Sequence, residues 1–331
     1  MEIGKLPNDV LEKIVFSNIK KKRDEVIVRA GVGRDNAIID FNRDLCIIST
    51  DPITGTDKNI GKLAINISCN DIAVSGGEPL GVLLTIMAPP NTTVKDIENI
   101  MIEAGRAACE LNVEIIGGHT EITAAVNRMV LSATVIGKQN RNEMIDPSKV
   151  KVGDKIIMTK WAGIEGTSII VKEMGEKWKE KLSIDEYEDA LNMDNLLSVL
   201  KEGVILGKLG ANYMHDITEG GVYGAVWEAS KVIEKGVKIW KENIPIKEVT
   251  KRICESFDIN PYRLISSGSM LAVVPSGNIE EIKENFIKEG IKLSVIGEII
   301  EEGIFVEEMG KKENISEPGS DELYKALSKL S

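Results

Sequence analysis

The stretch Ser49–Gly77, STDPITGTDKNIGKLAINISCNDIAVSGG, joins an apolar strand to an unusually apolar helix. The strand, Leu45–Ser49, is followed by Asp51 and a polar loop that a glycine interrupts. In the helix after this loop, Leu, Ile, Ala and Val occur on almost every side, which predicts a helix that is buried all round. Such a helix must be covered on every face, so the rest of the chain is expected to fold around it.

Three polar residues interrupt this apolar helix, namely Asn66, Asn70 and Asp71. A buried carboxylate costs several kcal/mol unless a positive or hydrogen-bonding group compensates it. Two interpretations fit the stretch equally well: Asp71 binds a metal ion, or it is a structural residue that hydrogen-bonds to a helix N-terminus. Carboxylates in similar settings elsewhere in the chain favour the metal ion.

The length of 331 residues predicts two domains, each with its own core. A polar connection over residues 139–153, which contains Pro147, separates two halves of similar composition. We therefore place an N-terminal domain at residues 1–149 and a C-terminal domain at residues 150–331.

Charge and cysteine usage narrow the class of protein. A net charge of -11 argues against a nucleic-acid partner, because no basic surplus exists to displace phosphate counterions. The four cysteines occur singly, which suits reduced thiols in a cytoplasmic protein and argues against a zinc site. We expect neither a signal peptide nor a membrane partner, because no apolar run is long enough.

Both halves mix helical and strand patterns. The first half predicts a helix over 5–19, a strand–turn–strand over 25–41, a strand over 79–87, a helix over 94–111, a short strand over 114–118 and a strand over 128–138. The second half predicts a strand over 155–160, helices around 167–174 and 185–208, a strand that ends near residue 216, a helix over 222–234, and a strand, helix and strand over 270–274, 279–289 and 293–300.

Acidic and glycine residues gather at two further places. The segment 212–221, NYMHDITEGG, places Asp216 and Glu219 on a strand that leads into a helix, and carboxylates that bind metal near a helix N-terminus make a place for a phosphate. The segment Gly117–Glu121, GGHTE, predicts a loop where the backbone approaches a ligand. For His119 the alternative is an ordinary hydrogen-bonded imidazole. The Gly31–Gly33 pair is better explained by a turn between strands than by a dinucleotide fingerprint.

Taken together, these segments resemble the superfamily of aminoimidazole ribonucleotide (AIR) synthetase, whose members include selenophosphate synthetase, thiamine-monophosphate kinase and a hydrogenase-maturation carbamoyl dehydratase. The matching segments are GVGRDNA (31–37), STD (49–51), GK (61–62), NDIAVSG (70–76), GGHTE (117–121) and HDITEGG (215–221). The resemblance implies an α+β fold of two domains: an N-terminal sheet that forms the interface of a homodimer, and a C-terminal α/β sandwich. It also implies that ATP with Mg²⁺ binds in a cleft to which both subunits contribute.

The resemblance also assigns roles to individual residues. Magnesium prefers oxygen ligands, and the matching carboxylates are Asp35, Asp51, Asp71 and Asp216. The residues that would bind the nucleotide are Gly31, Gly33, Asn36, Lys62, Asn70, Gly117, Gly118, Thr218, Gly220 and Gly221; of these Lys62 supplies a point charge for the phosphates. His119 and Glu121 are the candidates for acid–base catalysis.

The subfamily is less closely defined. IGKLA (60–64), NDIA (70–73) and HDITEGG (215–221) are most similar to the hydrogenase-maturation branch, whose members end in a cysteine that carries the thiocarboxamide, whereas this sequence ends in SKLS. We therefore predict an enzyme that uses ATP and Mg²⁺ to phosphorylate or activate a small-molecule acceptor. The alternatives are a hydrogenase-maturation-like protein and a nucleotide-binding regulatory dimer without turnover.

Lys62 and Asp71 raise a geometric question. They are nine positions apart, so at about 100° per residue a straight helix points them to opposite sides. Either the helix begins after Lys62, or Lys62 reaches a site that the second subunit completes. The resemblance favours the second alternative.

Overall fold

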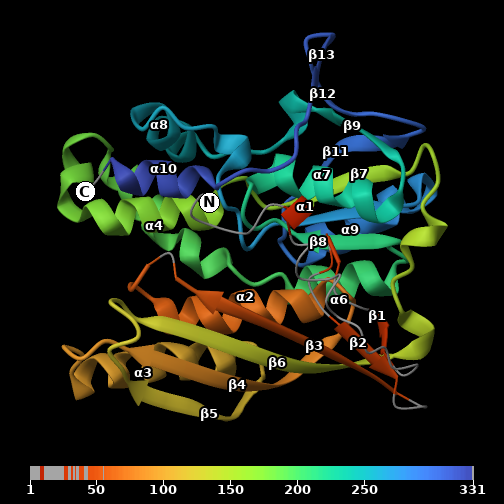
Figure 1. The fold of residues 1–331 in the computed structure, drawn as a ribbon. Coiled ribbons are helices and arrows are strands. Elements are labelled where there is room, and N and C mark those ends of the chain that lie inside the picture. The colour runs from red at the N-terminus through yellow and green to blue at the C-terminus, as the bar shows by residue number, and fades with distance from the viewer. Residues whose placement is uncertain are drawn as a thin grey trace.

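The computed structural model describes residues 8–10, 26–28, 31–32, 34, 37–40, 44–54 and 56–329. The chain forms two sheets with helices packed against them (Figure 1), which confirms the predicted α+β class. The predicted boundary after residue 149 lies between the last strand of the first sheet and the first strand of the second. No helix in this described part of the chain is both long and apolar enough to cross a membrane.

The N-terminal sheet has six strands, and its order is β1-β2-β3-β6-β4-β5. All neighbours are antiparallel except β4 and β5. The strands are β1 (Val26–Val28), β2 (Ala37–Asp40), β3 (Asp44–Ile53), β4 (Glu78–Ala88), β5 (Glu114–Ile122) and β6 (Val130–Asn140); the helices of this half are α1 (Asn8–Val10), α2 (Ile60–Ala73) and α3 (Val94–Glu110). Helices α2 and α3 pack together against one face of the sheet (Figure 1).

The buried helix predicted from the sequence is α2. All but one of its residues are buried, because it lies between the N-terminal sheet, α3 and the C-terminal half. Gly61 allows this packing, since a Cβ there would lie 2.3 Å from the carbonyl oxygen of Ile100 on α3. Helix α3 is amphipathic, and a capping box between Thr93 and Asp96 fixes its start.

The C-terminal sheet has seven strands, and its order is β13-β12-β9-β11-β7-β10-β8. The strands are β7 (Lys155–Thr159), β8 (Tyr213–Asp216), β9 (Gly236–Trp240), β10 (Met270–Val274), β11 (Leu293–Ile300), β12 (Ile304–Glu308) and β13 (Lys311–Asn314). The helices are α4 (Ile164–Met174), α5 (Ile184–Asn192), α6 (Leu200–Lys208), α7 (Gly221–Ile233), α8 (Glu248–Ser256), α9 (Ile279–Lys288) and α10 (Glu322–Ser328). Short 3-10 turns, such as Met193–Leu196, join several of them.

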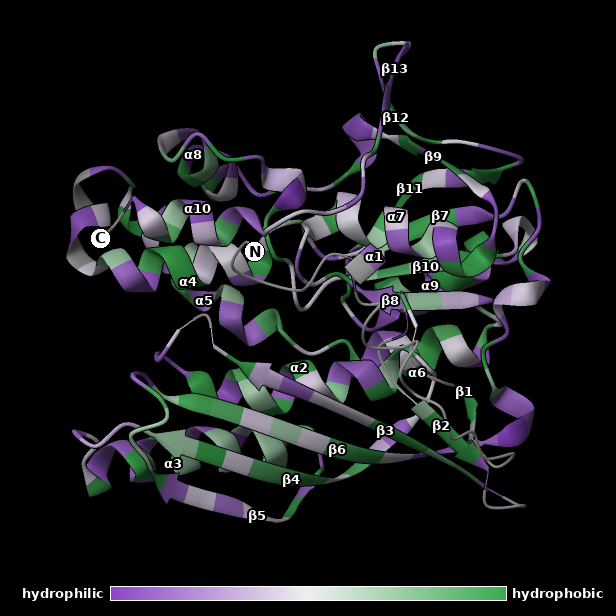
Figure 2. Cartoon of the chain, viewed as in Figure 1, coloured by the Kyte–Doolittle hydropathy of each residue, from purple (hydrophilic) through white to green (hydrophobic). Residues whose placement is uncertain are grey.

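Both faces of this sheet are covered, so its central strands are apolar throughout. In β7, Ile156 and Met158 belong to the core under α7, while Ile157 belongs to the core under α6 and α9. A further layer of α4, α5, α8 and α10 has its own core. Figure 2 shows the resulting pattern, with β4 and β10 largely green, β5 pale and purple over much of its length, and the outer strand β13 purple.

Two predicted elements differ from the structure. The helix expected over 185–208 is divided into α5, a 3-10 turn and α6, because Lys160 binds the carbonyl groups of Leu196 and Ser198, which therefore turn away from a helical path. The segment Gly117–Glu121 is not a loop, because β5 continues to Ile122 as an edge strand beside β4. Of the helix predicted over 5–19, only residues 8–10 lie within the described residues.

Candidate functional site

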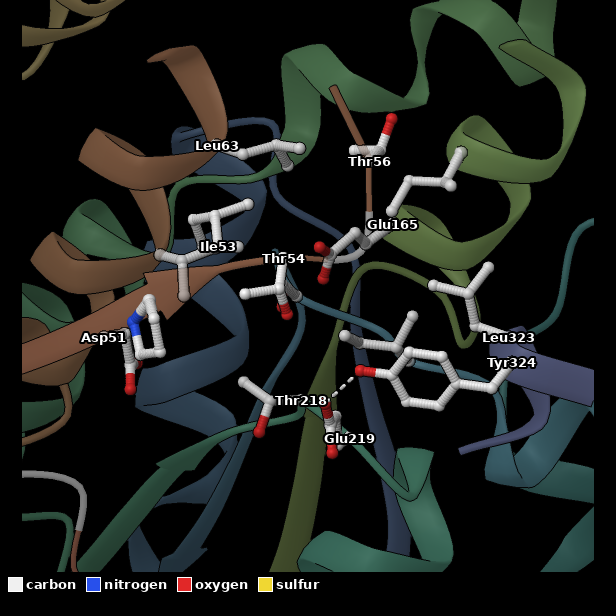
Figure 3. Close-up of a pocket in the computed structure, with 15 residues that line it drawn as sticks. Asp51, Ile53, Thr54, Thr56, Leu63, Glu165, Thr218, Glu219, Leu323 and Tyr324 are labelled. Carbon is white, nitrogen blue, oxygen red and sulfur yellow. Dashed lines mark hydrogen bonds between the residues drawn. The ribbon is translucent and has the colours of Figure 1, made fainter. Parts of the chain in front are cut away.

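A cavity of about 330 Å³ lies between the two halves of the chain (Figure 3). Its walls come from the end of β3 and the loop after it, from α2, from the first turns of α4, from the turn before α7 and from α10. The volume falls in the range of about 300–1,000 Å³ that small-molecule sites occupy. The cavity is therefore the first candidate for the functional site.

Strand β3 directs Asp51 towards this cavity. Successive side chains of a strand alternate between faces, so Ser49, Asp51 and Ile53 lie on the face that packs against α2. The Ser49 hydroxyl donates a hydrogen bond to the Asp71 carboxylate on α2. Asp71 is buried, so its carboxylate needs a compensating partner. The bond from Ser49 is compatible with a structural role and with a metal-binding role. Asp51 lines the cavity, whereas Asp71 is not among the lining residues and accepts from Ser49, two residues before Asp51 on the same face of β3.

The Asn70 side chain makes two hydrogen bonds within the chain. Its side-chain amide donates to the carbonyl oxygen of Leu197 over 2.8 Å, and its side-chain oxygen accepts from the backbone N–H of Val199 over 2.9 Å. The residue is fully buried. These bonds tie α2 to the segment before α6, and nucleotide binding by Asn70 stays a prediction.

Lys62 lies within α2, because the helix begins at Ile60. The alternative that the helix starts after Lys62 is therefore wrong. The ammonium group donates to the side-chain oxygen of Asn195 over 2.7 Å and lies 3.6 Å from the Asp194 carboxylate, both in the same chain. Asp194 also accepts from Asn59 over 2.7 Å, so it joins the start of α2 to the C-terminal half.

The turn between β8 and α7 brings Thr218 to the cavity, while Asp216 is buried at the end of β8. The backbone N–H groups of Gly220 and Gly221 are both used within the chain. Gly220 donates to the Asp321 carboxylate over 2.7 Å, and Gly221 donates to the carbonyl oxygen of Thr218 over 3.0 Å. In this structure a carboxylate thus occupies the place at the α7 N-terminus that the sequence suggested for a phosphate.

Asp321 connects three segments, since it also accepts from the backbone N–H groups of Ile265 over 3.2 Å and Leu323 over 2.8 Å. Burial raises the pKa of Asp321 to about 7, although these backbone donors act in the opposite direction. The residue therefore fixes α10 against α7.

His119 and Glu121, the predicted acid–base residues, lie outside the cavity, on β5. Both side chains are exposed on β5, and their nearest polar atoms are 3.3 Å apart. His119 is in register with Thr85 on β4, Thr85 with Ser132 on β6, and Ser132 with Pro52 on β3. Three strand spacings separate His119 from the end of β3, or roughly 14 Å. Within one chain, His119 and Glu121 do not join Asp51.

The glycines beside them have a packing role. A Cβ at Gly118 would lie 1.9 Å from the carbonyl oxygen of Leu84, so only glycine fits at this position. Gly117 is exposed on the same strand. Their nucleotide-binding role stays a prediction. At the other end of the sheet, the Gly31 carbonyl accepts from the Arg34 N–H over 3.1 Å in a turn.

The four predicted metal ligands can be placed only in part. Asp35 lies outside the described residues, as do Gly33 and Asn36. Among the residues that the structure describes, no group of three or more His, Cys, Asp or Glu side chains is arranged to hold a metal ion. The set of Asp35, Asp51, Asp71 and Asp216 therefore stays a prediction.

Sequence reasoning missed two polar residues that line the cavity, namely Glu165 and Tyr324, whereas Glu219 was singled out in the segment 212–221. Glu165 belongs to the first turn of α4, and only 4% of its surface is exposed. Burial raises the pKa of Glu165 to about 7, while the neighbouring Ser267 acts in the opposite direction. A carboxylate in the otherwise apolar pattern of α4 was the available indication, since the same feature singled out Asp71 on α2.

Comparison with known proteins identifies the class to which this fold and cleft belong. Two family models match the chain: "AIR synthase related protein, N-terminal domain" over residues 33–139 and "AIR synthase related protein, C-terminal domain" over residues 151–309. The chain belongs to the AIR synthase-related family.

Individual relatives agree with this result. A putative hydrogenase expression/formation protein of Methanocaldococcus jannaschii is 25% identical over 333 residues, which cover 96% of this chain and 95% of the relative. Two solved structures share the fold. Hydrogenase maturation protein HypE in complex with ATP has a TM-score of 0.73 and 17% identity, with 96% of each chain covered. AaThiL complexed with AMPPCP and TMP has a TM-score of 0.75 and 20% identity, with 97% of this chain and 98% of the other covered.

Proposed function

We propose that this protein is an ATP- and magnesium-dependent enzyme that phosphorylates or activates a small acceptor in the cavity between its two halves. One observation carries the proposal. Asp51 and Thr218 come from the two segments that most resemble the superfamily, lie far apart in the sequence, and line the same cavity. The solved relatives that hold ATP or AMPPCP support a nucleotide as the common ligand.

The residues present suit Mg²⁺ in chemistry. Magnesium is bound by few carboxylates together with phosphate oxygens and water, so it does not require a cluster of three protein ligands. Asp51 faces the cavity and would be the first ligand, whereas Asp71 is not among the lining residues. When bound, the ion neutralises charge that develops on the transferred phosphoryl group.

A homodimer would complete the site. The face of the N-terminal sheet that α2 and α3 do not cover carries exposed apolar side chains, among them Leu80 and Leu83 on β4. Strand β5 is the sheet edge, and edge strands with apolar neighbours favour association. Association through this sheet would bring His119 and Glu121 of one subunit to the cavity of the other.

Two alternatives remain as candidates. The similarity to the M. jannaschii protein over 96% of this chain favours a hydrogenase-maturation-like role. A nucleotide-binding regulatory dimer without turnover is the second alternative, and it would bind ATP in the same cleft. Sustained ADP release in the presence of a metabolite pool separates an enzyme from a regulatory dimer.

Isothermal titration with ATP, with and without magnesium, tests the proposal. We expect binding that requires magnesium in the wild type and is at least about tenfold weaker in Asp51→Asn, because the substitution removes a charged oxygen ligand. Asp185→Asn is a matched control, since Asp185 is exposed on α5 away from the cavity. The absence of any heat of binding in the wild type would contradict the proposal.

A further inference from the structure

Lys160, directly after β7, is buried in the C-terminal half and surrounded by oxygen atoms. Only 8% of its surface is exposed. Its ammonium group donates to the carbonyl oxygens of Ser198 over 2.6 Å, Gly268 over 2.8 Å and Leu196 over 3.1 Å. It also forms an ion pair of 2.6 Å with the Glu202 carboxylate on α6. The ammonium group therefore lies among four oxygen atoms, three of them from the backbone.

The backbone of Lys160 is held in an uncommon conformation. Its φ is 54°, in the left-handed region that residues other than glycine seldom adopt. Such a conformation costs free energy and persists only where the surrounding structure fixes it. The backbone N–H of Lys160 donates to the carbonyl oxygen of Lys292 over 2.9 Å, so the main chain and the side chain are both fixed.

One of the four oxygen atoms belongs to the loop on the C-terminal wall of the cavity. Gly268 follows Ser267, which lines the cavity. Gly268 has a φ of 101°, and a Cβ there would lie 2.4 Å from the carbonyl oxygen of Leu196. The loop and the segment before α6 are therefore in direct contact, and Lys160 binds a carbonyl group of each.

The segment before α6 in turn holds α2, the buried helix between the two halves. Asn195 accepts from Lys62 over 2.7 Å, and the backbone of Leu197 and Val199 bonds the Asn70 side chain over 2.8 and 2.9 Å. Helix α6 also packs against α2 (Figure 1). Two other residues of α2 line the cavity itself. Lys160 thus connects a loop on one wall of the cavity to the helix on the other.

The oxygen atoms around Lys160 resemble the shell of a monovalent cation. Proteins bind potassium ions through rings of backbone carbonyl oxygens. Burial lowers the pKa of Lys160, and the Glu202 carboxylate acts in the opposite direction. An uncharged amine has only two N–H groups for the four oxygen atoms, so these neighbours favour the ammonium form.

An ordinary structural ion pair explains these contacts less well. Buried ion pairs can often be replaced by apolar residues without loss of stability. Here three carbonyl groups also point at the ammonium group, and without a positive charge between them their oxygen atoms and the carboxylate would repel one another. The position therefore requires a cation and not only a bulky side chain.

We propose that Lys160 is a positioning residue that acts as a built-in monovalent cation, and that its ammonium group holds both walls of the cavity in place without a free alkali metal ion. The oxygen site is a property of the fold. Its effect on nucleotide binding rests on the proposed function, because Lys160 itself does not line the cavity.

The substitution Lys160→Gly tests the oxygen site directly. Glycine adopts a φ of 54° without strain, so the change removes the ammonium group and keeps the backbone conformation. Urea denaturation compares the variant with the wild type in potassium chloride, ammonium chloride and choline chloride at one ionic strength. In choline chloride, whose cation is too large to enter, the midpoint of the variant should lie at least about 1 M below that of the wild type. Potassium or ammonium should restore at least about half of this difference, because each binds the folded state.

Titration of magnesium-ATP in the absence of urea tests the positioning role. The wild type should have the same Kd in potassium chloride and in choline chloride. Lys160→Gly should bind about tenfold more weakly than the wild type in choline chloride and should regain affinity in potassium chloride. A loss of ATP binding that potassium does not restore would contradict the positioning role.

Control variants keep the outcomes distinct. Lys151→Gly removes an exposed lysine from the loop before β7, and its midpoint relative to the wild type should not depend on the cation. If Lys160→Gly does not fold in any salt, Glu202→Gln provides the test. It leaves the ammonium group in place, so its loss of stability should be equal in the three salts, and selective rescue by potassium would show that Lys160 does not fill the site.

Two further results would overturn the inference. One is a Lys160→Gly protein that folds and loses the same stability in all three salts. The other is a wild type whose ATP affinity requires potassium. If the wild type binds no ATP in any salt, the proposed function fails, while the salt dependence of unfolding still decides whether the oxygen site exists.

Discussion

The interdomain cavity and the edge strand β5 contrast in almost every physical property. The cavity is enclosed by segments from both halves, and one of its carboxylates, Glu219, accepts a hydrogen bond from Tyr324. On β5, His119 and Glu121 are exposed and lie three strands away from the cavity end of β3. Both regions contain residues that match the superfamily, yet one chain does not bring them together.

The two regions therefore depend on different contacts. The cavity is lined by residues of its own chain, with Tyr324 on its C-terminal side, whereas the proposed shared site also needs the edge strand of a second copy. His119 and Glu121 on the edge strand β5 can reach a cavity only if a second copy of the chain packs against the sheet. Substitutions on the sheet surface are therefore expected to affect assembly, and substitutions near the cavity are expected to affect stability or binding.

The largest expected effect concerns assembly. Leu83→Lys places a charge on the uncovered face of the N-terminal sheet, where Leu83 is 40% exposed. We expect the dimer dissociation constant to rise by about 100-fold, since both copies bury the charge. Sedimentation velocity measures this change. Ile287→Lys on α9 is the control and should leave the dimer intact. A Leu83→Lys protein that sediments as the wild type does would remove the basis for a shared site.

The next effect concerns the turn before α7. Gly221 has a φ of 61°, and a Cβ there would lie 2.6 Å from the carbonyl oxygen of Tyr262. Gly221→Ala should therefore lower the free energy of unfolding by about 2–4 kcal/mol. Gly105→Ala on α3 is the matched control, because its Cβ meets no atom within 4 Å and alanine is the better helix former. Urea denaturation compares the two variants, and equal stability of both would show that the turn tolerates a side chain.

A smaller and pH-dependent effect is expected at Glu165. Its folded-state pKa is raised from an ordinary 4.5 to about 7, so the folded protein holds a proton that the unfolded chain releases. This contribution to stability is present below the ordinary pKa and is lost as the pH rises through 7. Glu165→Gln should be more stable than the wild type near pH 8 by roughly 1–3 kcal/mol, with the difference disappearing near pH 4. A difference that does not change with pH in urea denaturation would show that folding does not raise the pKa of Glu165.

Much of the fold could be predicted from the sequence, since the strands at 270–274 and 293–300 and the buried helix α2 follow from runs rich in apolar residues. The site could be predicted only in part. Asp51 and Thr218 line the cavity as members of recognisable motifs. Glu165 and Tyr324 belong to no motif, and their importance comes from burial and from α10, an element that local patterns did not indicate.

The sequence did not indicate the hydrogen-bond partners of the Gly220 and Gly221 amides or the strand conformation of Gly117–Glu121. The amides of Gly220 and Gly221 were expected to face an anion, but Asp321 and the Thr218 carbonyl accept from them. Asp321 is 101 residues away from Gly220 along the chain, so motif spacing could not indicate it as a partner, and the bond to the Thr218 carbonyl depends on how the turn before α7 folds. The segment Gly117–Glu121 looked like a loop because glycines usually mark one, whereas here the close approach of Leu84 requires Gly118 within a strand.

A mixed dimer tests the central claim, that the cavity of one subunit works with the edge strand of the other. Subunits carrying Asp51→Asn are combined with differently tagged subunits carrying His119→Ala, and magnesium-dependent ADP release is measured for the purified heterodimer with the metabolite pool. In a shared arrangement one site carries both substitutions and the other carries neither. We expect both homodimers to be impaired and the heterodimer to recover about half of the wild-type rate, since a two-fold dimer has two equivalent sites. A heterodimer no more active than its parents, with the tagged wild-type dimer fully active, would contradict the account.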